Sequence, residues 1–181
     1  MSRAAKKEAR AMVHDVYHPG HVAKSNPIRY MGGVVDYYLS QGKGSGDFAL
    51  REGHEMSLDE IIGQIRAGLS ILELEHLQAG LEVSNDTLAP MLGISRATIH
   101  RIKGKGREKR LDPAVSDRVV RFARLMGKAI DVFGSRDDAR KWLSSPQFGL
   151  GGAVPFDYAT TELGAREVED LLGRIEHGVY S

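Results

Sequence analysis

Residues 86–103 read DTLAPMLGISRATIHRIK, and this stretch decides the fold class that we expect. Ala89 and Gly93 stand four residues apart. A small side chain at the first position lets a second helix approach, and glycine at the second permits a left-handed turn. The pattern therefore predicts a short helix up to Leu92, a turn, and a second helix over residues 95–103. Together these elements form a helix-turn-helix.

The apolar residues of the motif are spaced to hold its two helices together. The expected contacts come from Leu88, Leu92, Ile94, Ile99 and Ile102. Pro90 limits the first helix, because proline has no N–H to donate to the carbonyl four residues earlier. We therefore expect the first helix to be short.

Positive charge is concentrated at this motif. Residues 95–111 carry seven basic residues and one acidic residue, whereas the whole chain has a net charge of only +1. The first residues of a recognition helix reach base edges, and later basic residues meet phosphates. The candidate DNA-binding residues are Ser95, Arg96, Thr98, His100, Arg101, Lys103, Lys105 and Arg107. The alternative is a solvated basic turn. A single helix-turn-helix commonly acts as a twofold pair, so we also expect a homodimer.

The rest of the chain from residue 57 onward is also helical in pattern. Ser57 opens a capping box, Asp112 precedes a proline at the first helical position, and Ser135 follows the glycine that ends that helix. The expected helices are 57–68, 69–81, 112–134, 135–145 and 160–178, with a glycine-rich loop at 149–155. No sustained strand alternation interrupts them, so the predicted fold class is all-α.

We divide the chain into three segments. Residues 1–56 are expected to be a flexible or weakly structured arm, 57–111 a helix-turn-helix module, and 112–181 a second small helical module. The arm contains one apolar island, residues 34–39, which is too short to fold alone. It could dock on the helical core, pair across a dimer, or contact a partner protein.

Composition excludes several functional classes. The 181 residues contain no cysteine, which excludes disulfides, thiolate zinc sites, Fe–S clusters and cysteine nucleophiles. No apolar run reaches the length of roughly 18 residues that a membrane span needs, and the N-terminus lacks the apolar stretch of a signal peptide. We therefore expect a soluble cytoplasmic protein with no membrane association.

Two further sequence patterns have some features of chemical sites. His14, His18 and His21 have the spacing of one helix face, and a small metal-dependent enzyme built on them would hold stoichiometric metal. Pro19-Gly20 breaks such a helix, so an exposed flexible segment is favoured. The glycine-rich run at 42–46 lacks Walker spacing and is read as a linker. No nucleophile–base pair stands out, so we expect neither an enzyme nor a cofactor.

The region after residue 142 carries a more specific pattern. Its elements, in order, are Trp142-Leu143, Pro146, Gly151-Gly152, Pro155, Thr161-Glu162, Gly164-Ala165 and Gly178-Val-Tyr180. With these elements, residues 57–181 resemble the Xre/MbcA/ParS-type antitoxins of bacterial type II toxin–antitoxin systems. The resemblance implies an Xre/Cro-like DNA-binding module followed by a toxin-binding module. It also implies that the partner is a RES-domain toxin, which degrades NAD or transfers its ADP-ribose. The antitoxin would block the toxin's active-site cleft and bind its own promoter.

The resemblance and the surface pattern together suggest which residues meet the toxin. The candidates are Trp142, Gly151, Gly152, Glu162, Arg166, Glu169, Asp170, Arg174, His177, Tyr180 and Ser181. Trp142 could equally belong to the core. A pocket built for NAD should favour anions, so three carboxylates (Glu162, Glu169 and Asp170) and the chain terminus could occupy it as anion mimics. The alternative function is a stand-alone helix-turn-helix regulator with a C-terminal dimerisation or effector domain.

Overall fold

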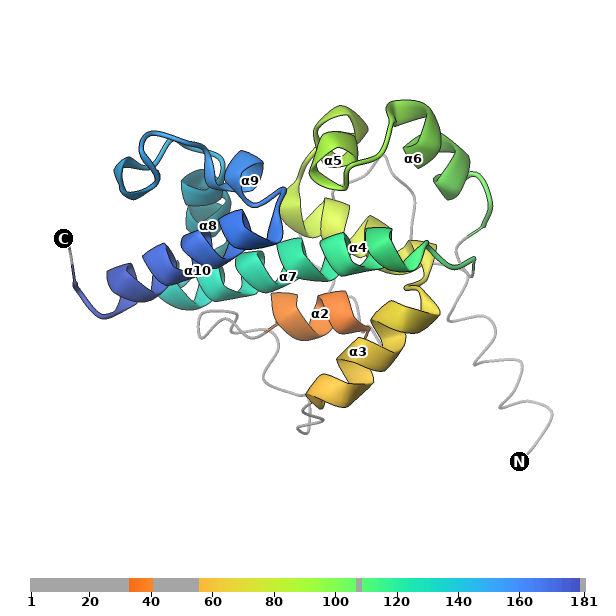
Figure 1. Ribbon diagram of the computed structural model, residues 1–181, viewed down its shortest axis with the longest axis horizontal. Coiled ribbons are helices and arrows are strands. Elements are labelled where there is room, and N and C mark those ends of the chain that lie inside the picture. The colour runs from red at the N-terminus through yellow and green to blue at the C-terminus, as the bar shows by residue number, and fades with distance from the viewer. Residues whose placement is uncertain (1–32, 41–55, 107–108, 180–181) are drawn as a thin grey trace, which may run out of the picture. The chain divides into compact units, whose positions relative to one another are not determined.

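The computed structural model describes residues 33–40, 56–106 and 109–179, all of which belong to one compact unit, Gly32–Ser181 (Figure 1). Its helices are α2 (Val34–Leu39), α3 (Leu58–Ala67), α4 (Ile71–Leu81), α5 (Asn85–Met91), α6 (Arg96–Lys103), α7 (Pro113–Phe133), α8 (Arg136–Leu143), the 3-10 turn η1 (Phe148–Leu150), α9 (Pro155–Tyr158) and α10 (Glu162–Glu176). Within these ranges extended pairing is limited to isolated bridges, one joining Ser70 to Arg110 and one joining Gln147 to Ala153. The prediction of an all-α fold is confirmed.

Side-chain caps fix where most of these helices begin. Ser57 and Glu60 form the expected capping box, and Asp112 caps the proline-initiated α7. Hydroxyl groups cap the N-termini of five other helices, and these caps are Ser70, Ser84, Ser95, Ser135 and Thr161. Two short elements, η1 and α9, lie in or just after the stretch expected to be loop. They are too short to produce a periodic pattern.

Helix α7 is the central element of this unit. Figure 1 shows it running beside α2, α3 and α4 along one part of its length and beside α8 and α10 along the other. Its inward face includes Val119, Phe122, Met126 and Ile130, which are almost completely buried. The helix-turn-helix and the C-terminal helices therefore share one continuous hydrophobic core.

The apolar island at residues 34–39 is helix α2, and it packs on α4 and α7 of its own chain. Val34 and Val35 are fully buried. The close approach depends on Gly127 of α7, where an added Cβ would collide with the backbone carbonyl of Tyr38. The sequence left three possible contacts for this island. In the structure it docks on the helical core of its own chain.

Both ends of α2 are held by side chains that are distant in sequence. The N-terminal amides of Val34 and Val35 donate to the Glu73 carboxylate of α4 at 3.1 and 2.9 Å. At the other end, Arg136 of α8 donates to the Leu39 carbonyl at 3.1 Å. Burial raises the pKa of Glu73 above its ordinary value. Helix α2 thus links the helix that precedes the helix-turn-helix to the C-terminal helices.

The histidine triplet at 14–21 and the glycine-rich run at 42–46 lie outside the described residues. Over the ranges that are described, no helix is long and apolar enough to cross a membrane. The same ranges contain no group of three or more acidic or histidine side chains arranged to hold a metal ion.

Candidate functional site

Helices α5 and α6 form the predicted helix-turn-helix. Gly93 adopts φ +62°, the left-handed conformation expected of it, and Ile94 N–H donates to the Ala89 carbonyl at 3.0 Å. The turn is attached to the central helix because Arg118 of α7 donates to the Leu92 carbonyl at 2.9 Å. The expected inter-helix residues Leu88, Leu92 and Ile99 are fully buried, and Ile94 and Ile102 are partly buried against them. The motif is therefore packed into the shared core, and a hydrogen bond from α7 holds its turn.

Pro90 lies inside α5, which has only seven residues. The expectation of a short first helix is confirmed. The Ala89 side chain is buried at the helix crossing.

The outward face of α6 carries three exposed candidates: Arg96, His100 and Arg101. Arg96 pairs with Asp86 of α5 at 2.9 Å, but both side chains are more than half exposed. Such a pair contributes little and can exchange for another anion. Ser95 and Thr98 make contacts within the helix start. The Ser95 hydroxyl accepts from the Thr98 amide at 3.1 Å, and the two hydroxyls lie 2.9 Å apart.

Lys103 is turned away from this outward face. Its ammonium donates to Asn85 of α5 at 2.9 Å and to the side chain of Gln78 in α4. Burial lowers the pKa of this lysine. Lys103 therefore fastens α6 to α4 and α5. Among the remaining candidates Lys105 is exposed, and Arg107 lies outside the described residues.

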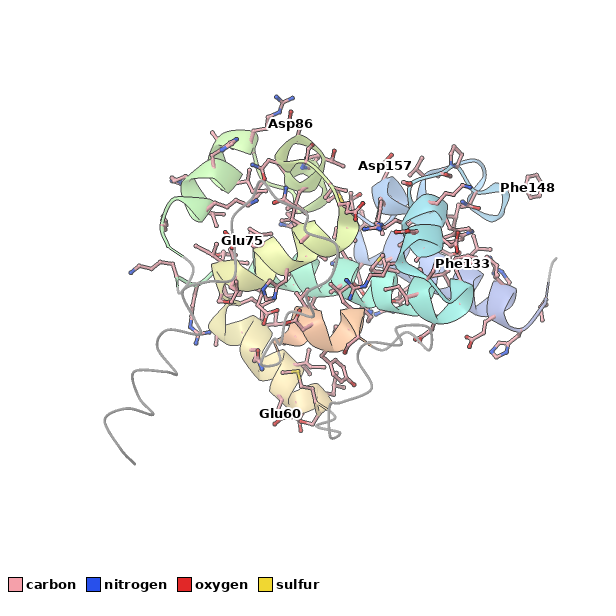
Figure 2. All side chains as sticks on the ribbon, turned by 180° about the vertical axis from the view of Figure 1, so that it is seen from behind. Glu60, Glu75, Asp86, Phe133, Phe148 and Asp157 are labelled. Atoms are coloured by element: carbon pink, nitrogen blue, oxygen red, sulfur yellow. The ribbon has the colours of Figure 1, made fainter. Side chains whose placement is uncertain are left out.

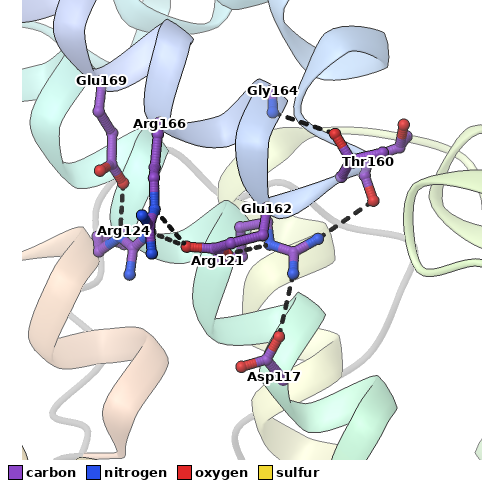
Figure 3. Close-up of polar contacts among 9 residues, drawn as sticks. Asp117, Arg121, Arg124, Thr160, Glu162, Gly164, Arg166 and Glu169 are labelled. Atoms are coloured by element: carbon purple, nitrogen blue, oxygen red, sulfur yellow. Dashed lines mark hydrogen bonds and ion pairs between the residues drawn. The ribbon is translucent and has the colours of Figure 1, made fainter.

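An ion-pair network joins α10 to the central helix (Figure 3). Arg121 of α7 is only 9% exposed, and its guanidinium donates to Glu162 at 3.2 Å, Asp117 at 3.1 Å and the Thr160 carbonyl at 3.1 Å. Arg124 donates to Glu169 at 2.6 Å. Neither arginine could be predicted as a site residue, because nothing in the spacing of α7 indicates what faces it.

The network includes two of the three carboxylates predicted to act as anion mimics, Glu162 and Glu169. Glu162 also pairs with Arg166 at 3.3 Å, so Arg121, Arg124 and Arg166 all lie within ion-pair distance of it. Glu169 is mostly buried, and its carboxylate forms an ion pair with the Arg124 guanidinium. Asp170 remains exposed on α10, as does His177 just after it, while Arg174 is half-buried. Tyr180 and Ser181 lie outside the described residues.

The glycine-rich loop is a closed, hydrogen-bonded turn. Gly151 and Gly152 both adopt positive φ, +66° and +87°. Gln147 N–H donates to the Ala153 carbonyl at 3.0 Å, which closes the loop. Trp142 is half-buried, and the centre of its ring lies 5.5 Å from the centre of the Phe133 ring. The loop also carries a residue absent from the candidates, Phe148, whose side chain is fully exposed.

Comparison with known proteins places this architecture in a family. A family model described as the antitoxin Xre-like helix-turn-helix domain matches residues 60–124. A second, the antitoxin Xre/MbcA/ParS C-terminal toxin-binding domain, matches residues 128–178. An antitoxin Xre of Photorhabdus laumondii is 31% identical over 168 residues, 92% of this chain and 99% of that protein. The chain belongs to the Xre antitoxin family.

Other relatives agree with this assignment. An antitoxin Xre of Yersinia enterocolitica is 36% identical over 127 residues, 67% of this chain and 81% of that protein. One from Pseudomonas putida is 36% identical over 72 residues, 40% of this chain and 45% of that protein. The Photorhabdus alignment leaves only 8% of this chain uncovered, so it extends into residues 1–56, which the motif resemblance had left out. The two family models meet between residues 124 and 128, inside α7.

Proposed function

We propose that this chain is an antitoxin that occludes the active site of a RES-domain, NAD-consuming or ADP-ribosylating toxin and represses its own promoter. The observation that carries the proposal is the match of residues 128–178 to a toxin-binding domain, directly after a match to a helix-turn-helix domain. Both domains share the core around α7, so one folded unit carries both proposed interfaces.

The RES identity of the toxin rests on the motif resemblance after Trp142. In this proposal the antitoxin acts by steric occlusion through residues 112–181 and has no catalytic role and no cofactor. Because Glu162 and Glu169 are already paired with arginines of the same chain, the exposed Asp170 is the better anion mimic of the three carboxylates. The proposed site of action is the cytoplasm, where promoter DNA and NAD are both present.

The proposed DNA interface is the outward face of α6 and the basic segment that follows it. Arg96, His100 and Arg101 are exposed on a helix whose other face is anchored in the core. Residues 95–111 carry seven basic residues and one acidic residue. A twofold pair of such helices would read two half-sites about one DNA turn apart, and we propose a homodimer for this reason.

A double substitution tests the DNA interface. We expect Arg96→Ala with Arg101→Ala to weaken binding to the region upstream of the chain's own reading frame by on the order of 100-fold, since each bidentate arginine contact with a base is worth about 1–3 kcal/mol. Gel-shift titration at fixed salt measures the change. The matched control is Arg66→Ala with Lys141→Ala, which removes two exposed positive charges from other helices. If both double variants lose affinity equally, α6 does not read the DNA.

A further inference from the structure

Phe148 contributes almost nothing to the fold that contains it. Its side chain is 100% exposed at the start of η1, and Figure 2 shows the ring projecting from the loop. Burying a phenylalanine side chain is favourable because it removes apolar surface from water, and the isolated chain gains none of this stabilisation. A ring presented in this way is available to a partner.

The loop that carries Phe148 is held in one conformation. The Gln147 side chain donates to the carbonyls of Trp142 and Ser145, both at 2.9 Å. Gly151 N–H donates to the Phe148 carbonyl at 2.9 Å, and Gly152 N–H donates to the Gln147 carbonyl at 2.9 Å. Gly149 packs so closely on Leu171 of α10 that an added Cβ would lie 2.6 Å from a leucine methyl. The backbone that presents the ring is therefore preorganised, which lowers the entropy cost of binding.

The surroundings of the loop favour a protein partner over an anionic one. Residues 143–165 contain no lysine or arginine and include Asp157 and Glu162. Nucleic acid and anionic membranes need basic contacts, and residues 143–165 themselves supply no lysine or arginine to make them. Among the described residues, Phe148, Tyr158 and Leu163 are exposed large apolar side chains within the toxin-binding match at 128–178.

We infer that Phe148 is an aromatic anchor of the toxin interface and inserts into an apolar pocket on the toxin. The inference rests on the proposed function, and names a contact separate from the carboxylates proposed to enter the active site. Aromatic residues, including phenylalanine, are enriched in the buried core of protein interfaces. Truncating a hot-spot residue there costs about 2 kcal/mol or more, about 30-fold in affinity.

The test compares two exposed apolar residues. The probe is the tagged product of the adjacent reading frame, purified as the complex, stripped in denaturant and refolded on the sensor. We expect Phe148→Ala to raise the dissociation constant at least about 30-fold and Phe148→Leu to retain most of the affinity. The control is Leu58→Ala, because Leu58 is 70% exposed but lies outside the toxin-binding match. It should bind as the wild type does, and the thermal melting of all variants should be unchanged.

The outcomes separate this inference from the proposed function. If Phe148→Ala binds the probe as tightly as the wild type does, the inference about Phe148 is overturned and the proposed function is not. The same holds if Phe148→Ala changes only the oligomeric state of the free chain, which would make the ring a contact between copies. If the product of the adjacent frame does not copurify with the wild-type chain, the proposed function fails and the inference fails with it.

Discussion

Replacing Gly127 by alanine is expected to lower the free energy of unfolding by about 2–3 kcal/mol, although alanine is the better helix former. The new methyl group would collide with the Tyr38 carbonyl, so α2 would have to move off α7. Val34 and Val35, now fully buried, would become exposed, and the Glu73 carboxylate would lose its two amide donors. Urea unfolding measures the loss, and hydrogen exchange at residues 34–39 reports whether α2 detaches.

The control for this variant is Gly63→Ala in α3. A Cβ at Gly63 meets nothing within 4 Å, so only the helix propensity changes. We expect a stabilisation of about 0.5–1 kcal/mol. If Gly127→Ala also stabilises the chain and leaves hydrogen exchange at 34–39 unchanged, α2 does not pack on α7 as described.

Arg121→Ala is expected to have a similarly large effect on stability, about 2–3 kcal/mol. A broken buried ion pair costs about 3–5 kcal/mol, but Glu162 and Asp117 are about half exposed, so water recovers part of that cost. The Thr160 carbonyl also loses its donor. Because these contacts hold the start of α10 to α7, we expect toxin binding to weaken together with the melting temperature.

Arg166→Ala is the control that shows whether the effect of Arg121→Ala comes from burial of the guanidinium or only from loss of a positive charge. Arg166 pairs with the same Glu162, but its side chain is 67% exposed. Its removal should cost no more than about 0.5 kcal/mol. Equal losses for the two arginines, measured by thermal unfolding at moderate salt, would contradict the role assigned to the buried guanidinium.

Local signals made most of the helices predictable. The serine caps, the Asp112-Pro113 start and the apolar spacing of α7 each act within a few residues, so the sequence displays them directly. The Ala89 and Gly93 pair likewise indicated the helix-turn-helix, because the left-handed turn needs glycine. The resemblance after Trp142 supplied the toxin-binding domain.

Long-range contacts were not predictable in the same way. Nothing near Val34 indicates that Glu73, 39 residues away, accepts its amide hydrogen bond. Lys103 has the sequence context of a phosphate contact, yet its ammonium is held by α4 and α5. Phe148 could not be told from a core residue, because aromatic side chains in short glycine-rich loops occur both buried and exposed. These features depend on how the helices pack, which periodicity does not encode.

Growth and cellular NAD, measured after induction of the adjacent reading frame with and without this chain, test the central claim most directly. We predict that the adjacent product alone arrests growth and either depletes NAD or ADP-ribosylates a target. Co-expression of this chain should restore growth and return the NAD level or the target to its state before induction. A variant in which Arg96 and Arg101, proposed to contact the promoter, are both replaced by alanine should still restore growth, since occlusion does not need DNA. A harmless neighbour, or a toxic one that this chain fails to neutralise, would contradict the account.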